Sequence, residues 1–190
     1  MKKLPSSRRG FSLIELLLVL GVIAVLLVAA FVIYPQVQSS NRANAESLNF
    51  SAMSAKISSL YATSPSSGRF RTLTNTVAMN ARIFPDGMRE GVTNPANVKS
   101  VWGGTVTVAG VPEYDYAQYW VTYEEVPSSD CIKFATGIVN GVEALNVGGL
   151  QVKFGVDANE GWVPGEIRPE NIAAGCNSAE KVTIIAQNKR

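Results

Sequence analysis

The chain has 190 residues, of which 46% are hydrophobic, and its seventeen basic side chains stand against fifteen acidic ones for a formal charge of +2. That length suits one modest domain, and so weak a net charge gives no argument for nucleic acid as a direct partner. The sequence holds no His and only two Cys. It therefore lacks Ser–His and Cys–His nucleophile pairs and a four-thiolate zinc site, and we expect neither a cofactor nor a bound metal.

The hydrophobic residues are concentrated near the amino end. Residues 16–34 (LLLVLGVIAVLLVAAFVIY) form a run of nineteen without a charge. As a helix this run would span about 28 Å, close to the hydrocarbon thickness of a bilayer. The first ten residues (MKKLPSSRRG) carry four basic and no acidic side chains. The positive-inside rule therefore predicts that the amino end stays in the cytoplasm while the rest is exported.

Three interpretations compete for this segment: a cleaved secretory signal peptide, an ordinary single-pass anchor, and an anchor with a further function. A secretory signal is disfavoured because the apolar run is long and no Ala-x-Ala-like cleavage site follows it. Glu15 favours the third interpretation. A carboxylate at the head of an apolar helix is costly when it is buried unpaired, so such an acid is a candidate functional residue.

The residues around Glu15 resemble a known processing signal. Residues 9–15 (RGFSLIE), with the basic leader before them and the apolar run after them, are similar to the type III signal of the type IV pilin superfamily. The resemblance implies that a prepilin peptidase of the inner membrane cuts between Gly10 and Phe11 and methylates the new amino group of Phe11. It also implies partners for assembly: an inner-membrane platform with its ATPase, and an outer-membrane secretin.

Removal of a leader at residues 1–10 would leave an α-amine on Phe11, four residues before Glu15. In a helical packing, this amine can lie beside the Glu15 carboxylate of a neighbouring subunit. Two charges that neither chain could bury alone then compensate each other. The cut would also leave thirteen basic against fifteen acidic side chains, so the basic isoelectric point of about 8.6 belongs to the leader.

We predict one long helix from about residue 13 to residue 63. Residues 11–34 would form its membrane or filament-core part, and residues 35–63 an amphipathic continuation. Pro35 is expected to kink the helix or to end it locally, because proline lacks an N–H and clashes with the preceding turn.

A one-sided apolar stripe in the second part is expected to lie on the chain's own sheet. The stripe consists of Phe50, Met53, Ile57 and Leu60, broadened by Leu48, Ala52 and Ala55, with Asn41, Arg42, Glu46 and Lys56 as polar positions.

Residues 64–190 are predicted to form a globular head. Several strands after one long helix indicate an α+β fold, in which an antiparallel sheet is laid on the helix and short accessory helices complete the head. The first two strands resemble a hairpin, and Ser128, Ser129 and Asp130 offer N-caps for a helix. The predicted strands cover residues 101–109, 117–126, 144–147, 151–154 and 181–186, and the predicted helices cover residues 73–82, 131–139 and a turn opened by Pro169.

Cys131 and Cys176 are the only cysteines. If the head faces the oxidising periplasm, the two can form a disulfide, and the alternative is a pair of buried free thiols. The chain-entropy model gives a closed loop of this length on the order of 4 kcal/mol of stabilisation. We expect a structural disulfide that closes the region 131–176.

The head also has a family resemblance. Residues 101–105 (VWGGT), 123–127 (YEEVP) and 130–137 (DCIKFATG) are similar to type IVb pilins, especially those of the thin-pilus and toxin-coregulated-pilus group. In that group a region bounded by paired cysteines forms much of the filament surface. The ten-residue leader and Phe11 are more like the type IVa class.

The predicted function is assembly: a major structural subunit that waits in the inner membrane, with its head in the periplasm, and polymerises into a surface pilus for adhesion, aggregation or conjugative mating. A minor pilin and a pseudopilin of type II secretion are the alternatives, because they share the amino-terminal signal. A membrane-tethered periplasmic enzyme is a more distant alternative, because no convergent acid–base set stands out in the sequence.

Overall fold

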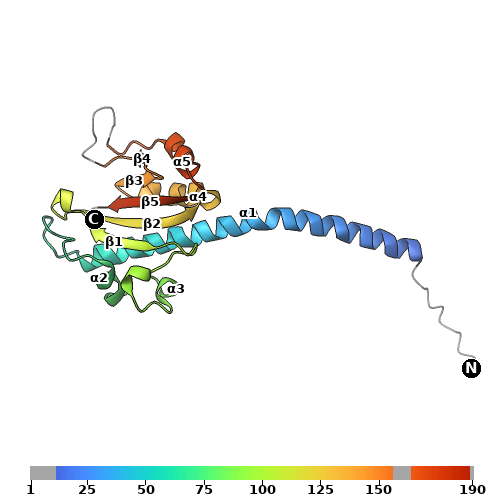
Figure 1. Cartoon of the computed structure of the whole chain (residues 1–190), viewed down its shortest axis with the longest axis horizontal. Coiled ribbons are helices and arrows are strands. Elements are labelled where there is room, and N and C mark those ends of the chain that lie inside the picture. The colour runs from blue at the N-terminus through green and yellow to red at the C-terminus, as the bar shows by residue number, and fades with distance from the viewer. Residues whose placement is uncertain (1–11, 156–163, 189–190) are drawn as a thin grey trace, which may run out of the picture. The chain divides into compact units, whose positions relative to one another are not determined.

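The structure is a computed structural model that describes residues 12–155 and 164–188. The chain divides into two compact units, Met1–Gln38 and Ser39–Arg190. One helix, α1 (Leu13–Leu60), belongs to both units, and the remaining elements form the head (Figure 1). The helices of the head are α2 (Asn75–Asn80), α3 (Asp86–Arg89), α4 (Ser128–Ile138) and α5 (Pro169–Cys176), and its strands are β1 (Val106–Gly110), β2 (Tyr119–Pro127), β3 (Ala144–Val147), β4 (Leu150–Lys153) and β5 (Lys181–Asn188).

Helix α1 continues through Pro35, so of the two predicted outcomes, a kink or a local end, the local end is wrong and the kink stays a prediction. Proline removes a single N–H donor, the one that would reach the carbonyl of Phe31, and the helix on either side keeps its own bonds. The helix ends at Leu60, three residues before the predicted end, and residues 61–63 form a turn.

Within the head, α1 buries a stripe that differs in part from the predicted one. Phe50, Met53 and Ile57 are buried as predicted, whereas Leu48 is 72% and Leu60 47% exposed. Ala52 and Ala55 are exposed as well, because with Leu48 they form the face of the helix that turns away from the core. The complete buried stripe repeats at intervals of four and three residues and consists of Ser39, Ala43, Glu46, Phe50, Met53 and Ile57.

The sheet confirms the predicted antiparallel α+β fold. Its strand order is β1-β2-β5-β3-β4, and every neighbouring pair is antiparallel. One face of the sheet shares a single hydrophobic core with α1 and α4. The largest fully buried side chains of this core include Tyr119, Tyr123, Phe70, Phe84, Phe134, Met53 and Ile57.

Two predicted boundaries are wrong for local reasons. Strand β1 begins at Val106 and not at residue 101, because residues 101–103 form a turn in which Gly103 has a φ of 84°. A Cβ on Gly104 would lie 1.8 Å from the Glu124 carbonyl oxygen. The backbone at residue 104 therefore approaches β2 so closely that only glycine fits. Helix α4 begins at Ser128, so Ser129 and Asp130 lie within its first turn and are not caps before it.

Both edges of the sheet are closed to a further strand. On β1, the Asn75 side chain donates to the Val106 carbonyl and accepts from the Val108 N–H. On β4, the Asn171 side chain donates to the Gln151 carbonyl, and the Arg168 N–H donates to the Val152 carbonyl. Occupied edge groups cannot template the addition of another chain.

The buried stripe predicts a matched pair of outcomes. Met53→Ala should lower the free energy of unfolding of the head by about 2–4 kcal/mol, because it leaves a cavity in a fully buried site. Leu48→Ala, on the exposed face of the same helix, should change it by less than about 0.5 kcal/mol. Denaturant unfolding of the detergent-solubilised full chain, followed by near-UV circular dichroism, measures both. Equal losses in the two variants would contradict this orientation of α1.

Candidate assembly elements

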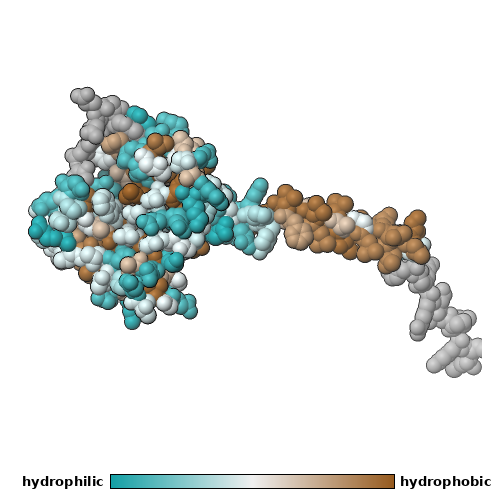
Figure 2. Space-filling view, in the orientation of Figure 1, coloured by the Kyte–Doolittle hydropathy of each residue, from teal (hydrophilic) through white to brown (hydrophobic). Residues whose placement is uncertain are grey.

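The first part of α1 is an apolar surface without cover. Every residue of α1 from Leu13 to Gln38 is exposed, and burial begins at Ser39. The most hydrophobic stretch of α1 has a mean hydropathy of 3.4 and none of it is buried, so the helix is long and apolar enough to cross a membrane. Figure 2 shows this stretch as a continuous hydrophobic surface. Such a surface requires lipid or other protein around it.

Glu15 lies in the first turn of α1 and is exposed. The Ser12 carbonyl accepts from the N–H groups of Glu15 and Leu16, at 3.0 and 3.1 Å, which starts the helix. A carboxylate in the first turn interacts favourably with the positive end of the helix dipole. Gly10 and Phe11 lie outside the described residues, so the cleavage and methylation site there stays a prediction.

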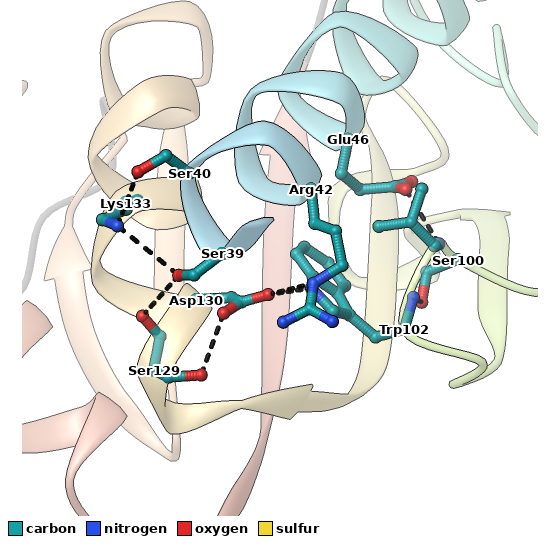
Figure 3. Close-up of polar contacts among 10 residues, drawn as sticks. Ser39, Ser40, Arg42, Glu46, Ser100, Trp102, Ser129, Asp130 and Lys133 are labelled. Atoms are coloured by element: carbon teal, nitrogen blue, oxygen red, sulfur yellow. Dashed lines mark hydrogen bonds and ion pairs between the residues drawn. The ribbon is translucent and has the colours of Figure 1, made fainter. Parts of the chain in front are cut away.

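A polar cluster joins α1 to α4 at the start of the head (Figure 3). Asp130 lies at its centre with a fully buried side chain. The Arg42 Nε is 3.0 Å and the Trp102 Nε1 is 2.7 Å from the Asp130 Oδ2. Also between α4 and α1, the Lys133 Nζ donates to the Ser40 Oγ at 2.7 Å. The cluster therefore ties α4 and the turn at 101–103 to one segment of α1.

The environment of Asp130 favours its charged form. Burial alone would raise the pKa of this carboxyl, but hydrogen bonds from side chains outweigh burial and lower the pKa below its ordinary value. The donors to this carboxylate are the side chains of Ser129, Trp102 and Arg42. The hydrogen bonds and the adjacent guanidinium group of Arg42 together offset the cost of burying the Asp130 charge.

Glu46, in α1, is the second buried acid of the described residues, and its surroundings differ from those of Asp130. Its Oε2 accepts from the Val101 N–H at 3.1 Å and from the Asn49 side chain at 3.4 Å, whereas its Oε1 has no hydrogen-bond partner among the described residues. Burial raises the pKa of Glu46, and it also raises that of Tyr123, whose hydroxyl faces this acid. Arg42, one turn earlier in α1, is paired with Asp130.

The disulfide between Cys131 and Cys176 is present, as predicted. Its two Cα atoms are 5.6 Å apart, and the bond joins the first turn of α4 to the end of α5. Both cysteines are fully buried. Because Cys131 follows Asp130 directly, the disulfide and the polar cluster hold the same turn of α4.

Neither Glu46 nor Asp130 could be identified from the sequence as a buried acid. Glu46 looked like a solvent-facing residue, although its spacing of four from Phe50 places it on the buried stripe. Asp130 looked like a helix cap. Its partners Arg42 and Trp102 lie 88 and 28 residues away in the chain, so local spacing carries no signal for them.

Glu46 predicts a pH dependence of stability. Because the pKa of Glu46 is higher in the folded head than in the unfolded chain, its contribution to stability is present at low pH and is lost as the pH rises through the folded-state pKa. Glu46→Gln keeps an acceptor for Val101 and cannot ionise. This variant should therefore raise the free energy of unfolding at pH 8 by on the order of 1 kcal/mol.

Denaturant titrations of the detergent-solubilised full chain between pH 4 and pH 8 measure this difference. The gain of Glu46→Gln should shrink toward about pH 4, where the unfolded wild-type carboxyl is protonated too. The exposed Glu124→Gln is the matched control and should show no such trend. A variant that is less stable than wild type at pH 8 would refute this view of Glu46.

Comparisons with known proteins address both parts of the chain. Residues 40–188 match the family model described as PilS N terminal, and residues 5–31 match the prokaryotic N-terminal methylation motif. The chain is 27% identical over 184 residues to the major structural subunit of the bundle-forming pilus of Escherichia coli O127:H6 (strain E2348/69 / EPEC), with 92% of each chain covered.

A crystal structure of a type IVb pilin from Salmonella typhi has the same fold. It aligns with a TM-score of 0.51 at 18% sequence identity and covers 77% of this chain and 99% of its own. The PilS model alone covers more than half of the chain. The chain therefore belongs to the PilS family of type IV pilins, whose members are structural proteins and not enzymes.

Proposed function

We propose that this chain is the major structural subunit of a type IVb pilus. The observation that carries the proposal is the uncovered apolar part of α1, which is joined to a complete and water-facing head. The Escherichia coli relative is described as the major structural subunit of a pilus, and the similarity extends over 92% of both chains. Similarity over nearly the whole length supports a shared role for stem and head.

Processing precedes assembly in this proposal. A prepilin peptidase cuts between Gly10 and Phe11, releases the leader at residues 1–10 and methylates the amine of Phe11. The match of residues 5–31 to the methylation motif supports this step. Glycine on the leader side of the cut leaves the scissile bond accessible, since it has no side chain to obstruct the approach of the enzyme.

Glu15 then sets the register between subunits. The methylated amine keeps its positive charge and pairs with the Glu15 carboxylate of another copy, so that both charges are compensated in an apolar surrounding. The exposure of Glu15 in the first turn of α1 leaves its carboxylate available to a second chain. Around this pair the apolar parts of α1 from many copies replace lipid by protein contacts, and their cohesion depends on close packing.

The closed sheet edges support assembly through the helix. Strand addition requires a free row of N–H and C=O groups. The side chains of Asn75 and Asn171 occupy such groups of β1 and of β4, respectively.

In this proposal the apolar helix holds the subunit in the inner membrane, with the head in the periplasm, until the assembly platform, ATPase and secretin move it into an extracellular filament.

The cut site gives a direct prediction. Gly10→Val should leave the leader attached, because a branched side chain obstructs access to the scissile bond. Intact-mass measurement of the membrane-bound protein should show a chain that still begins with its leader, whereas the wild-type chain should begin at Phe11 and carry one added methyl group. The matched control is Ser7→Val within the leader, which should be processed normally. A processed Gly10→Val protein would argue against this cut site.

The pairing of Glu15 gives a second prediction. Glu15→Val should yield processed, membrane-inserted subunits that assemble at least about tenfold less filament, because the amine of Phe11 then lacks its counter-charge. Sheared surface filaments, quantified against total subunit, provide the measurement. Leu16→Val, one residue along the same helix, is the control and should assemble normally. Abundant pili from Glu15→Val would remove Glu15 from the proposed mechanism.

A further inference from the structure

A hollow lies in the apolar part of α1, whose surface Figure 2 shows in brown. Its lining consists of Leu18, Gly21, Val22, Val25 and Leu26, all of them exposed. The first four stand at helix positions i, i+3, i+4 and i+7, the spacing of the four residues that form a hole in knobs-into-holes packing. Such a hole receives one side chain, the knob, from a helix that packs alongside. The hollow therefore has the arrangement that accepts a side chain of another helix.

Gly21 is the reason why this hole is deep. A Cβ on Gly21 would meet no atom of the described residues within 4 Å, apart from the backbone of its own helix, so alanine would fit the single subunit. Glycine inside a helix costs free energy relative to alanine. Close approach of a second helix offsets such a cost, because small residues let helices in apolar surroundings pack tightly.

The hole shares a face of α1 with Glu15. Glu15, Leu18, Val22 and Leu26 follow one another at intervals of three, four and four residues, which places them along one side of the helix. In the proposed function, the Glu15 carboxylate pairs with the Phe11 amine of another copy. The helix of that copy therefore begins beside the face that carries the hole, so another copy is the occupant closest at hand.

The Glu15 pair also fixes which residue of the neighbour reaches the hole. It shifts two parallel helices by four residues, about 6 Å along the axis. All copies enter the membrane in one orientation, so the helices are parallel and each residue of the neighbour lies level with the residue four positions later. The hole is centred between residues 21 and 22, level with residues 17 and 18 of the neighbour. Leu18 lines the neighbour's own hole, whereas Leu17 does not and is 59% exposed.

We infer that the hole around Gly21 binds the Leu17 side chain of a neighbouring copy. This inference rests on the proposed function and on its pairing of Glu15. Each copy then offers Leu17 to one neighbour and its hole to another, so the contact is heterologous. An interface of this kind propagates along an open helical array and does not close into a dimer.

Lipid is the other occupant of the hollow. In the proposed function, acyl chains surround this part of α1 before assembly and fill the hollow. An acyl chain has no fixed position along the helix, whereas Leu17 in the hole sets the same four-residue shift as the Glu15 pair. The charge pair and the hole would thus specify one register between copies.

A cysteine pair introduced into the full chain tests this register. The variant carries Leu17→Cys with Val22→Cys, and the native cysteines leave no free thiol in the described residues because they are bonded to each other. Five residues along one helix place the two new thiols on different faces, so they cannot join within a chain. Mild oxidation of sheared filaments should therefore give a ladder of dimers, trimers and larger multimers on a non-reducing gel. Leu17→Cys alone and Val22→Cys alone are the controls and should stay monomeric.

A size exchange tests the fit of the knob to the hole. Gly21→Val fills the hole and Leu17→Ala shortens the knob, and each should lower the yield of sheared filaments by about fivefold or more. The variant with both changes should recover to within about twofold of wild type, because the smaller knob fits the smaller hole. Ala24→Leu, which adds as many carbon atoms as Gly21→Val outside the lining of the hole, is the matched control and should stay within about twofold of wild type.

The outcomes separate this inference from the proposed function. Intact mass first establishes that each variant is processed as wild type is. If wild-type subunits form no filaments, the proposed function itself fails. If wild type forms filaments but the cysteine pair gives only monomers, the contact of Leu17 with the hole is refuted. Equal losses in Gly21→Val and Ala24→Leu, or a Gly21→Val variant that assembles normally, would also overturn the inference, because lipid or loose packing would then occupy the hollow.

Discussion

The apolar part of α1 is the constraint on which the rest of this protein depends. From Leu13 to Tyr34 the helix has no cover, and its hydrophobic surface is stable only in a bilayer or against other protein. A helix satisfies its own backbone groups, so it tolerates both surroundings without refolding. This property suits a subunit that exchanges lipid for protein. It also makes Glu15 conspicuous, as an acid at the head of a segment that otherwise carries no charge up to residue 34.

The head folds around the second part of α1. Phe50, Met53 and Ile57 anchor the helix in the core, and the polar cluster around Asp130 fastens the preceding turns to α4. The disulfide ties α4 to α5. The polar cluster and the disulfide both hold the first turn of α4, so α1, α4 and α5 are linked through this turn.

The closed sheet edges restrict how copies of this head can join. The occupied backbone groups of β1 and β4 oppose growth of the sheet by strand addition. In the proposed assembly, the apolar part of α1 therefore provides the main contact between copies.

The sequence was a good guide wherever a feature is local or periodic. The apolar run, the processing signal, the order of the five strands and the pairing of Cys131 with Cys176 all follow from composition, spacing or family resemblance, whereas α3 (Asp86–Arg89) was not predicted. It was a poor guide where distant segments meet. The burial of Glu46 depends on Val101 and Tyr123, and the roles of Ser129 and Asp130 in α4 depend on Arg42 and Trp102, so no window of the sequence contains both sides of either contact.

The most direct test of the central claim is the intact mass of the subunit recovered from sheared surface filaments of the wild-type cell. The claim predicts a chain that begins at Phe11, carries one methyl group on its amine and contains the Cys131–Cys176 bond. A filament-free surface, or a recovered chain that still begins at Met1, would contradict it.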